Sequence, residues 1–250
     1  MSRYRAAASH LGISLGVFIV LAAITLTFWY PGFFFELDGG WQGLRLLFCV
    51  DMVAGPLLTL IVYRAGKRGL AFDLSVIALF QSCCLALGLF VVYNERPLFL
   101  IYYDGHFYSS NAGAFTSYGV TPPDYRKFTD RSPAMVYVDL PNDPIEEADV
   151  QRIFYNDSVP LWTYSRLYAP LQPHLKDIVN EGTDIKRVRQ WDKEKQLDDW
   201  LADHGGVADD YAFFPVRARY ASMFLGVRKS DATIVGIVDI PIPAPTDSPG

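Results

Sequence analysis

The residue with the most evident chemical potential is an acid inside an apolar segment. Asp51 lies within residues 44–63, a run that is rich in leucine and valine. An ionised carboxylate at the centre of a membrane helix costs at least about 2.5–3.5 kcal/mol on insertion scales. Gly55 lies on the same helical face, and Pro56 leaves a helical carbonyl without its donor. This concentration of polar and backbone-exposing features predicts a point of helix–helix contact.

Two interpretations of this polar set remain open. In the first, the set forms a seam that contacts an apolar helix of a partner, and its members are Asp51, Gly55, Pro56 and Gln81. In the second, Asp51 pairs internally with Gln81 or with Arg45. A proton or ion path is disfavoured, because one carboxylate and one amide do not make a relay.

The part of the chain after Tyr93 contains no recognisable catalytic motif. It has no GxSxG, HExxH, P-loop or GxGxxG pattern, and its histidines show no metal-ligand spacing. Its adjacent aspartate pairs, Asp198-Asp199 and Asp209-Asp210, suit a solvated surface better than acid–base work. We therefore predict that the chain is not an enzyme and that it needs no metal or cofactor.

Charge divides the chain into two parts. Residues 1–93 hold 6 of the 22 Lys and Arg residues and 4 of the 27 Asp and Glu residues, which leaves the remainder with a net charge of −7. An acidic domain has no basic stripe to neutralise phosphates, so nucleic acid is excluded as a partner. The three cysteines all lie in apolar runs, so residues 94–250 have no disulfide framework.

Three apolar segments have the length of membrane helices: residues 11–30, 44–63 and 74–93. Twenty helical residues rise about 30 Å, which matches the hydrocarbon core of a bilayer. Bulky aromatic residues follow the first segment where a signal peptide would have a cleavage site, so we expect the segment to be retained. The sequence therefore predicts a membrane anchor over residues 1–93.

The basic residues of this anchor predict its orientation. Arg3 and Arg5 precede the first span, and residues 64–69 between the second and third spans are basic, whereas Glu36 and Asp38 lie in the first connection. By the positive-inside rule the N-terminus is cytoplasmic and everything after the third span is periplasmic. We expect a multi-pass protein of the bacterial inner membrane.

The first span also carries a stripe of small residues. Ala8, Gly12 and Gly16 are spaced by four and lie on one helical face. Small residues at this spacing allow helix backbones to approach closely. The stripe is a candidate packing face.

The second part of the chain, residues 94–245, has the pattern of an α+β domain. Strands are predicted at 98–103, 106–109, 134–140, 216–228 and 233–240, and helices at 143–156, 168–181 and 190–204. Asp104-Gly105 supplies the positive φ angles of a tight hairpin turn. The expected fold is an α+β membrane protein in which three transmembrane helices precede a periplasmic antiparallel sheet with packed helices. Residues 246–250 are expected to be a flexible tail.

Two arginines are candidates for contacts on the periplasmic side. Arg217 and Arg219 alternate along a predicted strand, so both are expected to point to one face. They would hold either a carboxylate of their own domain or an acidic group of a partner.

Three segments of the chain resemble the TfpX/TfpZ family of type IV pilin accessory proteins, also called FimB-like. They are residues 51–60 (DMVAGPLLTL), residues 93–97 (YNERP), and the closing residues 214–217 (FPVR) with the strand at 235–241. The resemblance covers nearly the whole length. The tail departs from it, because Pro-Ile-Pro-Ala-Pro stands where the family favours an aromatic end.

The resemblance implies a non-enzymatic, chaperone-like helper that assists the stability or assembly of a cognate type IV pilin. The implied partner is a pilin subunit, contacted at its transmembrane helix and at its periplasmic head. The lipid bilayer and a second copy of the chain are further expected contacts. The alternative is a periplasmic sensor or signal-relay protein without catalytic activity.

Overall fold

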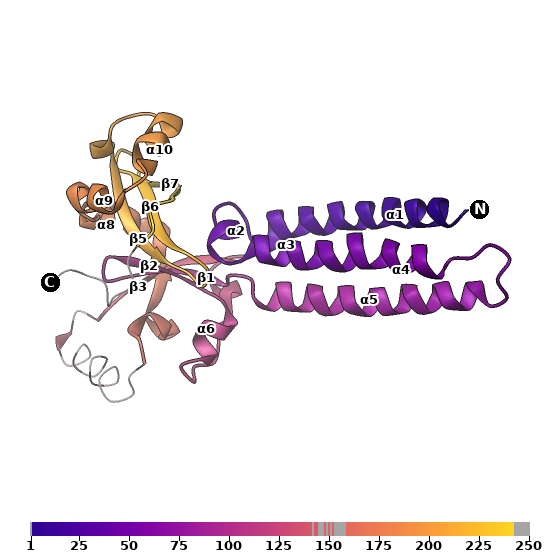
Figure 1. The fold of residues 1–250 in the computed structure, drawn as a ribbon. Coiled ribbons are helices and arrows are strands. Elements are labelled where there is room, and N and C mark those ends of the chain that lie inside the picture. The colour runs from indigo at the N-terminus through magenta and orange to yellow at the C-terminus, as the bar shows by residue number, and fades with distance from the viewer. Residues whose placement is uncertain are drawn as a thin grey trace. The chain divides into compact units, whose positions relative to one another are not determined.

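The computed structural model describes residues 2–141, 143–144, 148, 150, 152 and 159–242. The chain divides into two compact units, one ending at Arg96 and the other beginning at Pro97 (Figure 1). We call them the helical unit and the sheet unit. Each has hydrophobic clusters of its own.

Three helical segments in the described part of the helical unit are long and apolar enough to cross a membrane. They run from Arg3 to Trp29, from Gly40 to Val62 and from Leu70 to Asn94. The three apolar spans predicted from the sequence fall on these segments, so their helical nature is confirmed. The α-helices are α1 (Arg3–Ile24), α2 (Phe34–Leu37), α3 (Gly40–Phe48), α4 (Gly55–Val62) and α5 (Leu70–Asn94).

The second segment changes its winding in the middle. A π-helical stretch, Cys49–Ala54, joins α3 to α4, and it ends where Gly55 and Pro56 begin α4. Proline has no N–H to donate to the carbonyl of the preceding turn, and a wider π turn is one way to absorb that loss. Asp51 lies inside this stretch. A second π-helical stretch, Thr25–Trp29, ends the first segment.

The buried hydrophobic core of the helical unit lies where the first helical segment ends, the second begins and the third ends. Tyr30, Leu44, Leu47 and Val92 form its buried cluster. The Tyr30 hydroxyl donates to the Val92 carbonyl oxygen at 2.9 Å, so the chain after the first segment is tied to the end of the third.

The sheet unit is built on seven strands in the order β4-β3-β1-β2-β5-β6-β7. The strands are β1 (Phe99–Tyr103), β2 (His106–Ser110), β3 (Ala134–Val138), β4 (Tyr168–Pro170), β5 (Tyr211–Arg217), β6 (Ser222–Arg228) and β7 (Thr233–Val238). The hairpin of β1 and β2 is confirmed. Asp104 and Gly105 have φ angles of 49° and 72°, as its tight turn requires.

The prediction of an antiparallel sheet is wrong, because the sheet is mixed. β1 pairs with β3 in parallel, and β2 pairs with β5 in parallel, while the other neighbours are antiparallel. Long connections separate the members of each parallel pair, as parallel pairing requires. Strand patterns in a sequence do not report which distant strand becomes the neighbour.

The predicted strand over 216–228 is also wrong. β5 ends at Arg217 and β6 begins at Ser222, so a turn at Ala218–Ala221 divides the segment. The two strands pair along their whole length, from Tyr211 with Arg228 to Arg217 with Ser222. The predicted final strand corresponds to β7, which pairs with β6.

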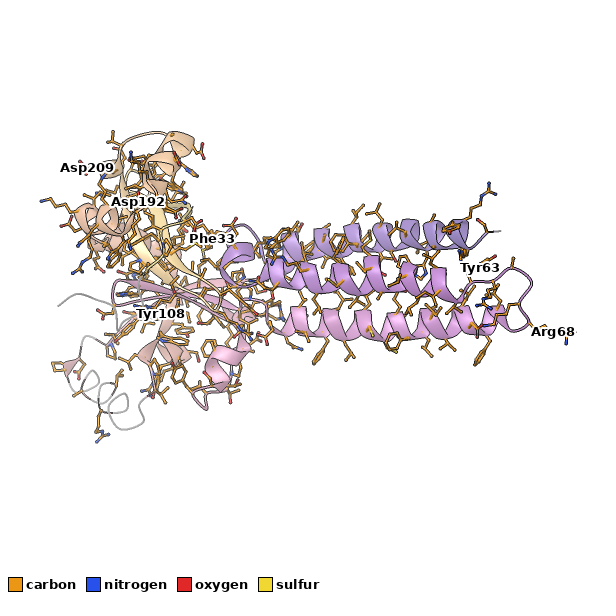
Figure 2. The ribbon with its side chains drawn as sticks, in the orientation of Figure 1. Phe33, Tyr63, Arg68, Tyr108, Asp192 and Asp209 are labelled. Carbon is orange, nitrogen blue, oxygen red and sulfur yellow. The ribbon has the colours of Figure 1, made fainter. Side chains whose placement is uncertain are left out.

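The predicted helices are present but shorter. The segment 168–181 contains β4, then α8 (Leu171–Ile178) and a 3-10 turn, Val179–Glu181. The segment 190–204 contains the end of α9 (Ile185–Trp191) and then α10 (Gln196–His204). Asp192 follows α9 (labelled in Figure 2), and its carboxylate accepts from the backbone N–H groups of Gln196 and Leu197 at the start of α10. Most of the helix predicted at 143–156, and the tail at 246–250, lie outside the described residues.

Shorter elements complete the sheet unit. α6 is Ala112–Thr116, and 3-10 turns lie at Tyr125–Lys127, Leu161–Thr163, Ser165–Leu167 and Ala208–Asp210. One aromatic cluster gathers around Phe99, Phe115 and Tyr168. Another gathers around Trp200, Phe213 and Phe224, where α9 and α10 cover the last three strands (Figure 1).

Candidate functional site

The polar residues of the helical unit meet in a buried network. Asp51 Oδ1 accepts a hydrogen bond from Gln81 Nε2 at 2.5 Å and from Ser14 Oγ at 3.0 Å. Gln81 Nε2 also lies 3.3 Å from the backbone oxygen of Asp51. The exposed fractions of Ser14, Asp51 and Gln81 are 2%, 4% and 9%. One residue from each long helical segment therefore contributes to the network.

Gly55 makes room for this network. A Cβ atom added there would lie 2.3 Å from Gln81 Oε1 and 2.5 Å from Gln81 Nε2, which is closer than real Cβ contacts. Any larger residue would push the Gln81 amide away from Asp51. The glycine predicted to serve close helix approach thus serves the approach of a side chain.

The network leaves two acceptor atoms without donors. Among the described atoms, Asp51 Oδ2 and Gln81 Oε1 are buried and have no hydrogen-bond partner. A buried polar atom without a partner costs about 1–3 kcal/mol. The network is therefore not satisfied to the extent expected of a purely structural core.

A second polar contact lies beside the first. His10 Nδ1 and Thr59 Oγ1 are 2.6 Å apart, and Thr59 is 4% exposed. His10 and Ser14 are one helical turn apart on α1, and Thr59 is one turn from Gly55 on α4. Neither Ser14 nor this pair was predicted from the sequence. The spacing of four between His10 and Ser14 is visible in the sequence, but it does not show that both side chains face inward.

Ser14 stands in a pattern with the letters of a nucleophile elbow, Gly12-Ile13-Ser14-Leu15-Gly16. A nucleophile elbow needs a sharp turn between a strand and a helix. This pattern lies in the middle of α1, and the Ser14 hydroxyl is buried against Asp51. The pattern does not form that catalytic structure.

The geometry bears on both interpretations of Asp51. Internal pairing with Gln81 is what the structure describes, while the Arg45 guanidinium lies over the Trp41 ring at 5.3 Å. The Asp51, Gly55 and Gln81 positions are buried among their own helices. Contact of this set with a partner helix stays a prediction.

The small-residue stripe, unlike the buried polar network, lies on the exposed surface of the helical unit. Ala8, Gly12 and Gly16 are exposed on α1. Cβ atoms added at the two glycines would meet nothing within 4 Å. The stripe therefore faces away from α4 and α5 and is not used in packing within the helical unit.

The two candidate arginines do not share a strand. Arg217 ends β5, in register with Tyr108 of β2, whereas Arg219 lies in the turn that follows, with its guanidinium over the Tyr220 ring. The expectation that both point to one strand face is wrong, because β5 ends between them. Burial raises the pKa of Tyr108, and the positive charge of Arg217 opposes that shift.

The sheet unit has clefts lined by charged and aromatic residues. One has a volume of about 460 Å³ and is lined by Tyr102, Tyr137 and Glu181 among others. The Tyr102 hydroxyl donates to Glu181 Oε2 at 2.6 Å, and burial, followed by this bond, raises the Tyr102 pKa. The Tyr137 ring lies nearly parallel to the rings of Tyr102 and His174, with ring centroids 5.9 and 4.5 Å away. In the described part of the chain, no three His, Cys, Asp or Glu residues gather at a possible metal site.

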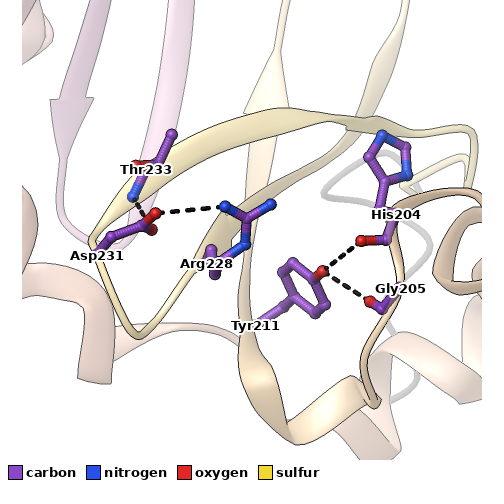
Figure 3. Close-up of polar contacts among 6 residues, drawn as sticks. All are labelled: His204, Gly205, Tyr211, Arg228, Asp231 and Thr233. Atoms are coloured by element: carbon purple, nitrogen blue, oxygen red, sulfur yellow. Dashed lines mark hydrogen bonds and ion pairs between the residues drawn. The ribbon is translucent and has the colours of Figure 1, made fainter.

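A second cleft, lined in part by Tyr211 and Arg228, lies at the end of α10. The Tyr211 hydroxyl donates to the carbonyl oxygens of Gly205 and His204 at 2.7 and 3.2 Å (Figure 3). Arg228 pairs with Asp231 at 3.3 Å, and Asp231 also accepts from the Thr233 N–H. These contacts close the end of α10 and the β6–β7 turn, which is a structural role.

The molecule thus combines an apolar helical unit, crossed by a buried polar network, with an α+β sheet unit. The sequence profile of the family described as fimbrial assembly protein FimB matches residues 1–39. The chain is 30% identical over 95 residues to "Fimbrial assembly protein, serogroups C1 and C2" of Dichelobacter nodosus, and this match covers 37% of the chain and 72% of the relative. The chain belongs to the fimbrial assembly protein family.

Another relative is matched over a smaller share of its own length. The protein "Fimbrial assembly protein, serogroup I" of Dichelobacter nodosus is 30% identical over 95 residues, which is 37% of each chain. The chain therefore spans little more than a third of that relative. The matches also cover less of the chain than the resemblance suggested from the sequence. No solved structure matches the chain.

Proposed function

We propose that the chain is an inner-membrane accessory protein, without catalytic activity, that assists the stability or assembly of a cognate type IV pilin. The observation that carries this proposal is the 95-residue match to proteins named fimbrial assembly proteins. The three long apolar helical segments support a place in the membrane. The N-terminus is proposed to be cytoplasmic and the sheet unit periplasmic.

The exposed stripe of α1 is the proposed contact for the client's apolar helix. Ala8, Gly12 and Gly16 offer a smooth helix surface with open space above both glycines. Close approach of helix backbones at such surfaces gains van der Waals contact in a lipid environment. Asp51 and Gln81 are already hydrogen-bonded to each other, so a client helix would reach them only by displacing one of the three helical segments. The role of the buried network is then to hold those segments together behind the stripe.

The sheet unit is the proposed contact for the client's periplasmic head. Arg217, half-buried at the end of β5, is its candidate contact residue together with Arg219. Both residues are cations, so this contact favours an acidic group on the client's head.

The stripe is tested by adding bulk where the helical unit has space. Gly12→Leu with Gly16→Leu should leave the amount of membrane-inserted protein unchanged, because the added side chains meet nothing in this chain. We expect strongly reduced surface pili and loss of a site-specific crosslink between α1 and the pilin. The measurements are pilus counts, the crosslink yield and the protein level in the membrane fraction.

The matched control adds the same bulk on another helix. Ala86 is exposed on α5, so Ala86→Leu should leave piliation and crosslinking at the level of the original protein. Full piliation in the double glycine variant would contradict the stripe as the contact. Full piliation in a strain that lacks the whole chain would contradict the assembly role itself.

A further inference from the structure

Five cations gather at one end of the helical unit. The first turn of α1 and the connection between α4 and α5 lie at the same end (Figure 1), and so do Tyr63 and Arg68 (Figure 2). The contact between His10 and Thr59 ties the two antiparallel helices one to two turns away from this end. The cations are Arg3, Arg5, Arg64, Lys67 and Arg68.

Several of these cations have no anion of their own. All five are exposed. Lys67 pairs with Asp73 at 2.5 Å, and Arg3 donates to the Tyr4 hydroxyl at 3.2 Å. Within the described residues, Arg5, Arg64 and Arg68 make no hydrogen bond or ion pair through their side chains. Three guanidinium groups are therefore available on a surface that holds a single carboxylate nearby, and that carboxylate is engaged.

Exposed aromatic rings accompany the cations. Tyr4 is 65% exposed and Phe72 is 73% exposed, and both lie within the first turns of their helices. Beyond them the faces of α1 and α5 are apolar and exposed, with Leu11, Ile13, Val76 and Leu79 among their residues. Aromatic rings between a cationic rim and an apolar face are typical of the level at which lipid headgroups lie.

We propose that these five cations form a cationic rim that binds the headgroup of an anionic phospholipid, whose phosphate is held by the exposed arginines that make no side-chain hydrogen bond or ion pair among the described residues, Arg5, Arg64 and Arg68. The guanidinium fork matches phosphate geometry through two parallel hydrogen bonds, and four of the five cations are arginines. A zwitterionic headgroup carries its own cation and gains less from this surface. The inference rests on the membrane location in the proposed function, but it does not depend on the pilin.

Lipid binding to the purified full-length chain in detergent tests the proposal. Native mass spectrometry would compare phosphatidylglycerol with phosphatidylcholine of the same acyl chains, and would include inorganic phosphate as a third probe. We expect tighter binding of phosphatidylglycerol. Each arginine near a charged headgroup contributes about a fivefold change in affinity, so Arg5→Gln with Arg64→Gln should weaken this binding by about 25-fold.

Two further variants make the result specific. Arg126→Gln with Arg187→Gln removes two exposed arginines from the sheet unit, and we expect no change in lipid binding. Arg5→Lys with Arg64→Lys keeps the charge and the orientation signal, and it should retain part of the selectivity. Equal binding of the two lipids would overturn the proposal. So would an equal loss in the sheet-unit variant, or inorganic phosphate that displaces the anionic lipid at equimolar concentration.

The outcome is separable from the proposed function. If pili assemble normally in the Arg5→Gln, Arg64→Gln strain while lipid selectivity is lost, the proposed function stands and the lipid site is confirmed. If lipid selectivity is absent while the Gly12→Leu, Gly16→Leu variant still loses pili, only the lipid site fails.

Discussion

The helical unit and the sheet unit treat buried polar groups differently. In the described part of the chain, four buried side-chain atoms have no hydrogen-bond partner, and three of them lie in the helical unit: Thr25 Oγ1, Asp51 Oδ2 and Gln81 Oε1. The sheet unit instead packs aromatic rings against one another, and its ion pairs Arg189–Asp198 and Arg228–Asp231 are exposed. The helical unit is thus specified by a few polar contacts among apolar surfaces, and the sheet unit by a dense core.

This difference predicts different responses to substitution. In the sheet unit the loss of a large ring leaves a cavity, and the cost follows the volume lost. In the helical unit the cost follows whether the Asp51 network keeps its geometry. Substitutions that separate these two sources of stability test the comparison directly.

The largest effect is expected in the sheet unit. Phe214 is fully buried and packs edge-on against Tyr102 and Phe107. Phe214→Ala should lower the free energy of unfolding of this unit by about 3–5 kcal/mol. Hydrogen exchange measured on the full chain should show lost protection in β1, β2, β5 and β6, while α1 and α5 keep theirs. Equal loss of protection in the helices would mean that the two units unfold together.

The two units also differed in how far the sequence predicted them. The helical segments were found from length and apolarity alone, since few other structures suit twenty apolar residues. The hairpin at Asp104-Gly105 was found because its turn needs positive φ angles. The parallel pairing of β1 with β3 was missed, because β3 lies more than twenty residues beyond β2. The residue pattern of a strand does not specify which distant strand it pairs with.

The candidate site could be predicted from the sequence only in part. Asp51 and Gln81 were found because polar residues are rare in apolar segments, and their pairing was one of two stated alternatives. Ser14 was missed because a serine in a membrane helix is common and carries little signal. That α1 turns Ser14 inward and Gly12 outward depends on how three helices pack, which helical periodicity alone does not fix.

An intermediate effect is expected at Gly55. Gly55→Leu places a side chain where the Gln81 amide lies, so it should break the bond between Gln81 and Asp51. We expect a loss of about 1–3 kcal/mol, as for other overpacked interiors, seen as a lower thermal midpoint of the full chain in detergent. Gly12→Leu is the matched control, since the same substitution on the outward face of α1 should leave the midpoint unchanged. If Gly12→Leu destabilised the chain as much, the inward and outward faces of α1 would have to be reassigned.

The smallest and most discriminating effect is expected at Asp51 itself. Asp51→Asn keeps the carbonyl oxygen that accepts from Gln81 and Ser14, and it replaces the unpartnered Oδ2 by an amide donor. Its thermal midpoint should therefore equal or exceed that of the original protein. Asp51→Leu has similar bulk but no side-chain acceptor, so the Gln81 amide loses its shortest hydrogen bond and the Ser14 hydroxyl loses its acceptor, at a cost of about 1–3 kcal/mol.

The order of these two variants decides what Asp51 contributes. If Asp51→Asn is stable and piliation is normal, the side chain serves as a hydrogen-bond acceptor between helices and its charge has no role. If Asp51→Asn is stable but pili are lost, the carboxyl group has a function beyond its contacts in the helical unit, and the contact with a partner helix gains support. Equal midpoints for Asp51→Leu and the original protein would contradict the network as a source of stability, because the loss of its central acceptor would then cost nothing.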